Sequence, residues 1–160
     1  MEFVCPCCKD GHLQYRDHCP RISRVKGGDA TWFWIPRCQC DNKGCHKIHR
    51  MLPDFMIKFK QYRTEVITNA LDQKKDFVED DNYNEHPSEK TIQRWHHWLM
   101  ANYLRIDGTL RSVGYRDLGF SEKLLKSGDS LLSELRASNR KWLEIVHRLV
   151  YNSGSRLETG

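Results

Sequence analysis

Apolar residues follow two different spacings along the chain, and the change falls near residue 60. Before it, residues 12–16 and 31–37 have the alternating or aromatic character of strands, and the second segment contains the run Trp32-Phe33-Trp34-Ile35. Lys26-Gly27-Gly28-Asp29 lies between them and is a strong turn signal. Leu52-Pro53-Asp54 closes this unit. The pattern predicts a β-hairpin in the first third of the chain.

After residue 60 the apolar residues recur at helical spacing. They predict a helix near 60–73 and a second helix that starts after its N-cap, Ser88, and ends at Asp107-Gly108. In the second helix, Ile92, Trp95 and Leu99 lie on one side. This side is expected to face the core.

Two further apolar stripes follow, near residues 121–136 and 139–152. Gly128-Asp129 interrupts the first, and Asn152-Ser153-Gly154 stops the second. Both stripes are typical of core-facing helices. Residues 74–86 are polar and acidic, and they predict a loop or a short helix.

Composition sets the class of protein. The chain has 160 residues, of which 39% are hydrophobic and 29% charged, as in water-soluble globular proteins. No apolar run approaches the length of a membrane span, and the N-terminal residues do not have the pattern of a signal peptide. We therefore expect a cytoplasmic protein without a membrane partner. In that reducing compartment its seven cysteines are better metal ligands than disulfide partners.

The cysteines form two tight groups about thirty residues apart. Cys5 and Cys8 have the C-x2-C spacing of a zinc knuckle, in which one turn directs two sulfur atoms at the same point. Cys40 and Cys45 lie four residues apart, which is a wider knuckle within the range of zinc sites. These four thiols are the expected ligands of one structural Zn²⁺ ion.

Alternatives to this ligand set remain open. Cys38 can replace Cys40, and either His46 or His49 can replace Cys45. Cys7 competes with its neighbour Cys8, whereas Cys19 is isolated and is interpreted as a structural or spare thiol. A catalytic zinc site is not expected, because neither an H-E-x-x-H nor an H-x-E…C-x-x-C arrangement is present.

The fold class that follows is α+β. A small N-terminal zinc-ribbon-like β unit, residues 1–59, precedes a mostly helical region of helix-turn-helix type. The helix-turn-helix-like unit is expected at residues 60–104, and helices of residues 105–160 are expected to pack on it. The connector between the first two helices is longer than the usual three- or four-residue turn. A short intermediate helix near 73–80 would restore the spacing.

Charge divides the chain into three parts. The net charge of +5 is the sum of +6 over residues 1–63, −5 over residues 64–87 and +4 over residues 88–160. Basic surface raises the prospect of a nucleic-acid partner. The acidic residues of the connector would repel phosphates if they faced a nucleic acid; they are Asp76, Glu79, Asp80, Asp81 and Glu85.

The helix after Ser88 offers a polar side for such a partner. Opposite its apolar residues lie side chains that can contact phosphates and base edges, namely Lys90, Thr91, Gln93, Arg94 and His97. Basic residues elsewhere are candidates for phosphate contacts: Arg37, Lys43, Lys47, Arg50, Lys58, Lys60 and Arg63. Double-stranded DNA is the expected partner, and a solvated polar face is the alternative.

Several motifs together resemble a family of small zinc-ribbon plus helix-turn-helix proteins of Gram-positive bacteria, whose activity is uncharacterised. The resemblance is carried by Cys5-Pro-x-Cys8, Ile35-Pro36-Arg37, Cys40…Cys45-His-Lys-Ile-His49, Leu52-Pro53-Asp54-Phe55, Lys60, Tyr62, Glu65-Val66-Ile67, Pro87-Ser88-x-x-Thr91-x-x-Arg94-Trp95 and Tyr151-Asn152-Ser153-Gly154. Such proteins look like the N-terminal parts of certain transposases and accompany mobile elements. The resemblance implies DNA binding and supports the same four cysteine ligands. Lys58, where relatives tend to have proline, and the additional thiol Cys38 depart from the pattern.

The expected function is therefore that of a non-catalytic, zinc-containing DNA-binding protein linked to a mobile genetic element. A zinc-stabilised protein-interaction adaptor or inhibitor is the first alternative, with Trp32, Phe33 and Trp34 as its exposed patch. A metal-dependent nuclease is the second alternative. The sequence contains no triad of spaced carboxylates in a catalytic-core pattern, so an enzyme is not expected.

Overall fold

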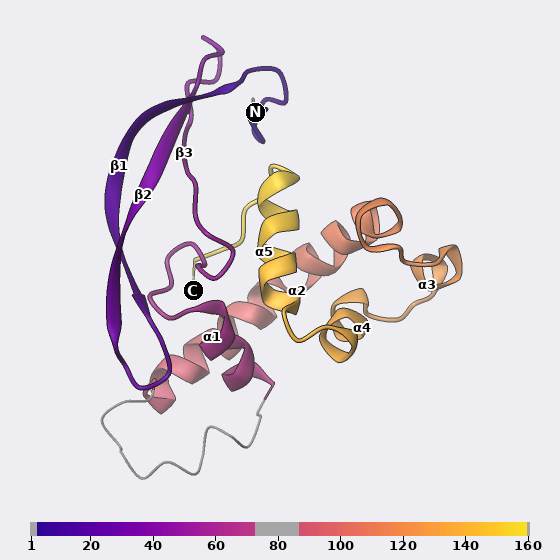
Figure 1. The fold of residues 1–160 in the computed structure, drawn as a ribbon. Coiled ribbons are helices and arrows are strands. Elements are labelled where there is room, and N and C mark those ends of the chain that lie inside the picture. Colours follow the sequence, from indigo (N-terminus) through magenta and orange to yellow (C-terminus); the bar gives the residue numbers. More distant parts are fainter. Residues whose placement is uncertain (1–2, 73–86, 160) are drawn as a thin grey trace.

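The protein has an N-terminal antiparallel sheet followed by a mainly helical region, which confirms the α+β class (Figure 1). The computed structural model describes residues 3–72 and 87–159. The predicted connector at 74–86, its acidic residues and the short helix near 73–80 lie outside this range. The elements are β1 (Leu13–Arg24), β2 (Ala30–Cys40), β3 (Ile48–Arg50), α1 (Thr64–Leu71), α2 (Glu89–Leu118), α3 (Glu122–Lys126), α4 (Leu131–Ser138) and α5 (Trp142–Asn152).

The sheet is built around a long hairpin. Strands β1 and β2 pair antiparallel, with Cys19 opposite Ile35, and β3 pairs with the C-terminal end of β2. Gly27 and Gly28 form the connecting turn with φ of 95° and 80°, a region that glycine enters without a steric penalty. Both strands extend beyond the predicted segments, and the three-residue strand β3 was not predicted.

Helix α2 begins as predicted but does not end at Asp107-Gly108. The Ser88 side chain caps it by accepting a hydrogen bond from the Thr91 amide at 3.3 Å. The helix then continues to Leu118 and ends at Gly119, whose φ is 67°. It continues because Leu110 extends the buried stripe. The Asp107 carboxylate accepts hydrogen bonds from Ser130 Oγ and the Leu132 amide, and thereby holds the start of α4.

The remaining helices agree with their apolar stripes. Helix α1 is shorter than the predicted segment 60–73, whereas the break at Gly128-Asp129 divides α3 from α4 as expected. Helix α5 ends at Asn152, and Gly154 follows with φ of 81°. No helix in residues 3–72 and 87–159 has both the length and the apolar content to cross a membrane.

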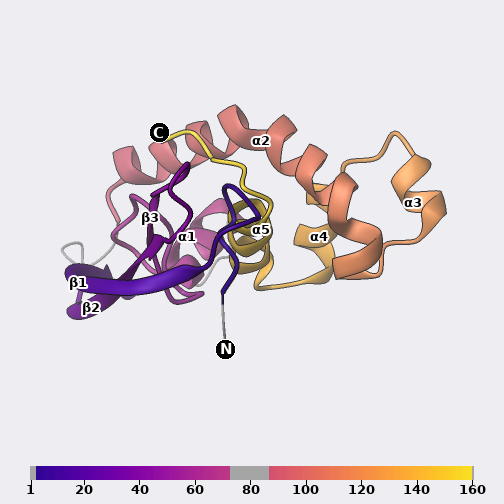
Figure 2. The ribbon, with the colours of Figure 1, turned by 90° about the horizontal axis from the view of Figure 1, so that it is seen from above.

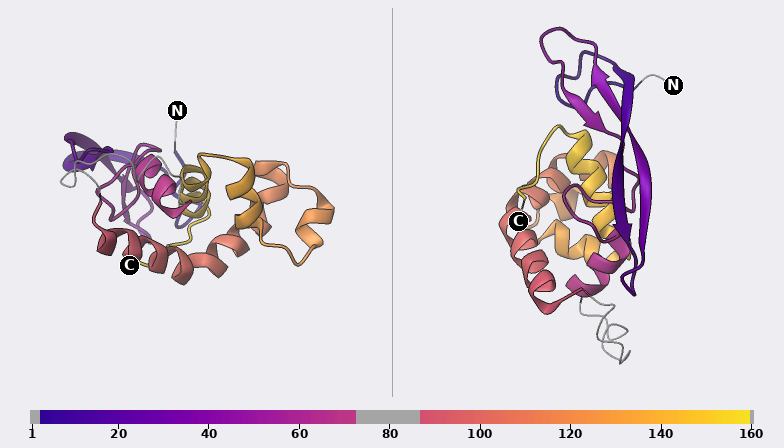
Figure 3. Two further views of the ribbon diagram at one scale, coloured as in Figure 1. Left: turned by 90° about the horizontal axis from the view of Figure 1, so that it is seen from below. Right: turned by 90° about the vertical axis from the view of Figure 1, so that its left-hand side faces the viewer.

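One hydrophobic cluster joins α1, α2, α4 and α5. Trp142, Leu132 and Ile106 are fully buried in it, and of residues 3–59 it includes only Ile57. The predicted division between residues 104 and 105 lies within α2, so the two predicted helical units share this core. Viewed from above and from below, α2 runs along one side of the helical body (Figures 2 and 3).

The hairpin lies beside the helices rather than within their core (Figure 3). Its inner face carries Phe33, whose ring centroid lies 5.5 Å from that of Phe55. Arg21 on the same face donates hydrogen bonds to the carbonyl oxygens of Ile57 at 3.0 Å and Lys60 at 2.8 Å. These contacts hold the middle of the hairpin against the segment before α1. The end of the hairpin opposite the Gly27-Gly28 turn is held by other contacts, which involve the cysteines.

Candidate metal centre and polar helix face

Four cysteines meet at the open end of the hairpin, opposite its Gly27-Gly28 turn. Cys5 and Cys8 come from the loop before β1, Cys40 is the last residue of β2, and Cys45 lies in the turn before β3. Their sulfur atoms all lie within 4.8 Å of one another. Cys5 Sγ is 3.9 Å from Cys45 Sγ, and Cys8 Sγ is 3.7 Å from Cys40 Sγ. A tetrahedron with Zn–S bonds of 2.3 Å has edges of about 3.8 Å. The four thiols therefore have the spacing for one tetrahedral metal ion.

Backbone hydrogen bonds shape both cysteine loops. In the first loop the Cys5 amide donates to the Gly11 carbonyl at 2.7 Å, and the Lys9 amide donates to the Cys5 carbonyl at 2.9 Å. In the second loop the Cys45 amide donates to the Asn42 carbonyl at 2.9 Å. These bonds close two tight turns, and each turn directs its two thiols toward the other pair.

Gly11 permits the close approach of the two loops. A β-carbon at this position would lie 2.5 Å from Cys40 Sγ and 2.7 Å from Asn42 Cβ. Both contacts are shorter than real β-carbon contacts, so any side chain here forces the loops apart. A glycine next to the first knuckle is thus a steric requirement of the four-sulfur cluster.

The loops also set different proton affinities for two of the thiols. Backbone N–H groups of Asp10 and Gly11 lower the pKa of Cys8 to about 6, because they stabilise the thiolate. Burial raises the pKa of Cys40 to about 12. At neutral pH without metal, the Cys8 thiol is thus more readily deprotonated than the Cys40 thiol, and a metal ion must displace the proton of Cys40.

His49 lies beside the cluster rather than among its four sulfur atoms. Its Nε2 is 3.4 Å from Cys5 Sγ, and its Nδ1 is 2.6 Å from the Tyr151 hydroxyl. Burial raises the pKa of Tyr151 to about 12 and lowers that of His49. The neutral imidazole thus bridges the Tyr151 hydroxyl and the Cys5 sulfur, and its tautomer sets which partner donates. Such contacts orient a metal ligand.

The end of α5 also packs on the first cysteine loop. Lys9 Nζ donates a hydrogen bond to the Asn152 carbonyl oxygen. A β-carbon at Gly154 would lie 2.6 Å from the Pro6 carbonyl oxygen, so this turn also needs glycine. With the Tyr151 contact, these interactions form what we call the α5 clasp. Sequence reasoning did not identify the clasp, because nothing local indicates that residues 151–154 meet residues 6–9.

The other thiols and His46 lie outside the four-sulfur cluster. Cys7, Cys19 and Cys38 are partly buried free cysteines, and His46 is exposed with φ of 46°. The structure therefore groups the four cysteines that the spacing predicts, and the four-sulfur cluster includes none of the rival ligands.

A family model described as a domain of unknown function (DUF6431) matches residues 5–95. This match covers more than half of the chain. The chain belongs to the DUF6431 family. No curated protein and no solved structure matches it.

The DUF6431 match contains the whole metal centre and ends inside α2. It includes all four cysteines, the three strands and α1, whereas α3, α4 and α5 follow it. Because Tyr151 and Gly154 contact the metal centre, the centre of this DUF6431 protein is completed by residues outside the matched range.

The polar side of the first turns of α2 is exposed in this DUF6431 protein. Trp95, Trp98 and Leu99 are buried on the opposite side. Thr91 is partly buried, and its hydroxyl lies 3.0 Å from that of Ser88. The predicted side chains that lie at the surface are Lys90, Gln93, Arg94 and His97. We call these four the α2 polar face.

The basic residues predicted to contact phosphates fall into two groups. Exposed members are Lys43, Lys47, Arg50 and Lys58. The others are already engaged: Arg37 pairs with Asp17, Lys60 Nζ lies 5.1 Å from the Trp98 ring centroid, and Arg63 Cζ lies 4.9 Å from that of Phe55. Burial lowers the pKa of Lys60. Arg37, Lys60 and Arg63 therefore serve the fold of this DUF6431 protein.

Arg156 is a basic residue that sequence reasoning missed. The pKa of Lys58 is lowered by burial and then by the nearby charges of Arg156 and Arg50. All three side chains belong to exposed residues. The C-terminal tail therefore adds a positive charge to the surroundings of Lys58.

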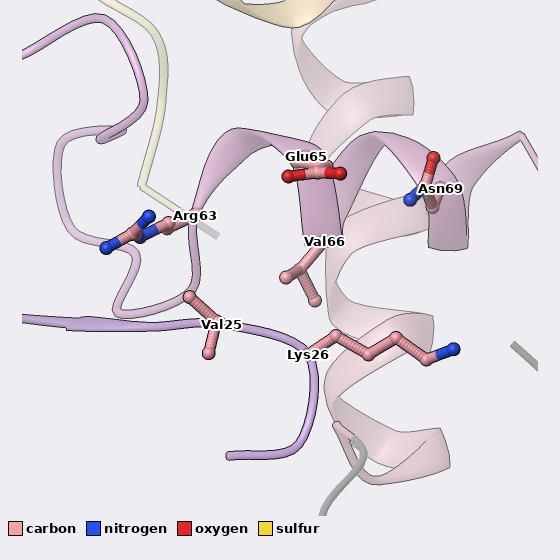
Figure 4. Close-up of a pocket in the computed structure, with 6 residues that line it drawn as sticks. All are labelled: Val25, Lys26, Arg63, Glu65, Val66 and Asn69. Atoms are coloured by element: carbon pink, nitrogen blue, oxygen red, sulfur yellow. The ribbon is translucent and has the colours of Figure 1, made fainter. Parts of the chain in front are cut away.

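A shallow pocket lies between the hairpin turn and α1 in this DUF6431 protein (Figure 4). Its volume is about 150 Å³, below the range of typical small-molecule sites. Its lining residues are Val25, Lys26, Arg63, Glu65, Val66 and Asn69. The pocket contains neither a cysteine nor a histidine, so it is separate from the metal centre.

Proposed function

We propose that this DUF6431 protein is a non-catalytic DNA-binding protein whose N-terminal unit is held by one structural zinc ion. Four thiolates complete the tetrahedral shell that zinc prefers in structural sites, which leaves no position for an activated water. Cys5 and Cys40 are almost fully buried, as a closed site requires. The ion would link the loop before β1 to both ends of the second cysteine loop.

The α2 polar face is the observation that carries the DNA proposal. Arg94 and Gln93 have the donor and acceptor groups that read base edges, whereas Lys90 and His97 suit phosphate oxygens. The face lies within the first three turns of a long helix that is anchored by Trp95 and Trp98. A rigid helix with an exposed polar face over its N-terminal turns has the dimensions to enter a major groove.

Positive charge near the cysteines supports a second set of contacts. Burial and then the charges of Arg156 and Arg50 lower the pKa of Lys58, and all three residues lie at the surface. A DNA phosphate would relieve their mutual repulsion. This grouping replaces Arg37, Lys60 and Arg63 in the proposed backbone contacts.

The link to a mobile genetic element rests on the motifs that resemble N-terminal parts of transposases. Helix-turn-helix geometry would pair α1 with α2, and these helices do share the hydrophobic cluster. The segment that joins them, residues 73–86, lies outside the described residues. Duplex binding and the link to a mobile element can both be tested with DNA from such elements.

Duplex binding can be measured by fluorescence anisotropy with a labelled random duplex at several salt concentrations. We expect Arg94→Glu to weaken binding at least tenfold, because it replaces a positive charge on the α2 polar face with a negative one. Lys123→Glu is the matched control, because it reverses an exposed charge on α3 at the far end of the molecule (Figure 1). Equal affinities of the two variants, or no binding of duplex at low salt, would reject the DNA proposal.

The same variants separate the alternative functions. A protein-interaction adaptor predicts that Arg94→Glu preserves the biological effect of the protein. A metal-dependent nuclease predicts DNA cleavage that a chelator abolishes while the fold persists. Structural zinc predicts instead that a chelator unfolds the N-terminal unit, with a loss of near-ultraviolet circular dichroism from Trp32 and Trp34.

A further inference from the structure

The β1–β2 hairpin runs along one side of the helical body (Figure 1), and several exposed aromatic side chains share one of its faces, the outer face. Trp32 and Trp34 are 65% and 67% exposed, and Tyr15 is 65% exposed. In the strand register, His18 pairs with Pro36, and Pro20 pairs with Trp34, so these side chains lie on the same face. Exposed tryptophans at alternate positions of one strand are costly in water unless a partner covers them.

The ladder is held in place by contacts within the hairpin. The Tyr15 hydroxyl lies 3.0 Å from His18 Nδ1. The His18 ring packs edge-on against Trp34 with 5.2 Å between ring centroids. On the inner face, Phe33 packs on Phe55 and Arg21 is bonded to the chain near Lys60, so the outer face cannot turn inward. The rings are thus presented on a fixed support.

Charge indicates which partner fits this face. Strands β1 and β2 contain four arginines and a single acidic residue, Asp17. Arg37 pairs with this carboxylate. Arg16 lies exposed beside Tyr15, with its Nε 3.8 Å from the Asp17 carboxylate. Arg24 is partly buried beyond Ile22 at the other end of the face and donates one hydrogen bond to the Gly28 carbonyl oxygen at 3.0 Å. Each guanidinium has further N–H donors beyond these contacts. A ring-bearing surface with positive charge at both ends complements a chain that has flat aromatic groups and a negative backbone.

Spacing supports the same partner. Residues two apart on a strand lie about 7 Å apart, since each residue advances about 3.4 Å. This is roughly twice the 3.4 Å rise between stacked bases of one strand in a duplex. A stretched single strand can therefore place successive bases on Trp32 and Trp34, whereas bases paired inside a duplex expose no ring face to stack on.

We propose that the outer face of the hairpin, through Trp32 and Trp34, is a base-stacking platform for single-stranded nucleic acid. It is a second surface, separate from the α2 polar face, and it does not require duplex binding. The two tryptophans supply stacking, which tolerates any base, and Arg16 and Arg24 supply contacts to the phosphates.

The test uses the full-length zinc-loaded protein with a labelled 15-nucleotide oligothymidine, and an abasic strand of equal length as a second probe. We expect Trp34→Ala to weaken oligothymidine binding at least tenfold, and the Trp32→Ala/Trp34→Ala double variant to weaken it further. Trp34→Phe keeps a ring and should stay within about threefold of wild type. The abasic strand, which carries the charge without the bases, should bind at least tenfold more weakly than oligothymidine.

Tyr115→Ala is the matched control, because Tyr115 is 71% exposed on α2, away from the hairpin. It should leave oligothymidine affinity unchanged. Thermal unfolding shows whether each variant keeps its fold, and the exposure of Trp34 predicts that it does.

Wild-type affinity of Trp34→Ala, or equal binding of the abasic strand, would overturn the platform. Binding to anionic phosphatidylserine vesicles without binding to oligothymidine would overturn it in favour of a membrane surface, and binding to neither probe would overturn it as well. Failure of the duplex proposal has a different signature, namely an Arg94→Glu variant that binds duplex like wild type.

Discussion

Replacing Gly11 with alanine tests the metal centre at its tightest point. The added methyl group would lie 2.5 Å from Cys40 Sγ, 2.7 Å from Asn42 Cβ and 2.9 Å from Asp41 Oδ1. Relief requires that the loop of Cys40 and Cys45 move away from the loop of Cys5 and Cys8. Two of these neighbours belong to the turn that positions Cys45, so the movement cannot be confined to one flexible side chain.

The expected magnitude follows from the cost of overpacking. Inserting a methyl group into a packed site costs about 1–3 kcal/mol. Because each 1.4 kcal/mol changes an equilibrium constant tenfold, zinc affinity should fall about 5- to 150-fold. The φ of Gly11 is not positive, so alanine adds steric conflict without backbone strain.

Zinc affinity can be measured by competition with a chromophoric chelator. Gly44→Ala is the control, because Gly44 lies in the second cysteine loop and its β-carbon would meet only Asn42 Oδ1, at 3.3 Å. It should change the affinity less than threefold. A Gly11→Ala protein that binds zinc like wild type would refute the argument, and it would mean that the Cys40 thiol is not held where the ion binds. The Cys38→Ser variant tests whether Cys38 replaces Cys40 as a ligand. It should still bind one zinc ion per chain, because Cys38 lies outside the four-sulfur cluster.

Three further predictions concern the support of the fold. Tyr151→Phe removes the hydroxyl that bonds His49 at 2.6 Å and should lower the free energy of unfolding by about 1–2 kcal/mol in urea titrations with zinc; an unchanged midpoint would contradict the α5 clasp. Asp72→Ala should cost about 2–4 kcal/mol in the same assay, because it removes the carboxylate that pairs with Arg136 and leaves the Trp142 indole N–H without its acceptor, whereas Asp72→Asn, which keeps a carbonyl oxygen, should cost less. Burial and the charge of Lys58 lower the pKa of His147 against the opposing effect of Asp54, so the folded protein binds fewer protons than the unfolded chain, and stability falls as the pH drops below about 6.5. As the pH falls from 7.5 to 5.5, wild type should therefore lose more stability than His147→Gln. A stability difference that does not change with pH would contradict a neutral His147 in the folded protein.

The cysteine pairs show what spacing alone can predict. Cys5 and Cys8 belong to one tight turn, and so do Cys40 and Cys45, so each pair converges for local reasons. The hairpin that unites the pairs was also predictable, because Gly27 and Gly28 mark its turn. Strand lengths were not, since the polar stretch after Arg16 lacks alternation and pairs only because β2 lies opposite.

The errors have equally specific causes. Asp107-Gly108 has the composition of a helix end, but the Asp107 carboxylate instead holds Ser130 and the start of α4. Lys60 was predicted to contact phosphate because of its positive charge, but it packs on Trp98. Both depend on neighbours far away in the sequence, and a pattern read along one chain does not contain that information.

The α5 clasp has a consequence for the order in which the molecule folds. The sulfur atoms of the metal centre are joined by contacts between residues 32 and 40 positions apart, whereas the Tyr151 contact with His49 spans 102 positions. Closing a longer loop costs more entropy, and during synthesis the cysteines leave the ribosome before α5 exists. The ion is therefore expected to bind while the hairpin end is still uncovered, and α5 then seals a centre that is already loaded. Exchange of the bound metal in the finished protein would accordingly be limited by the opening of α5.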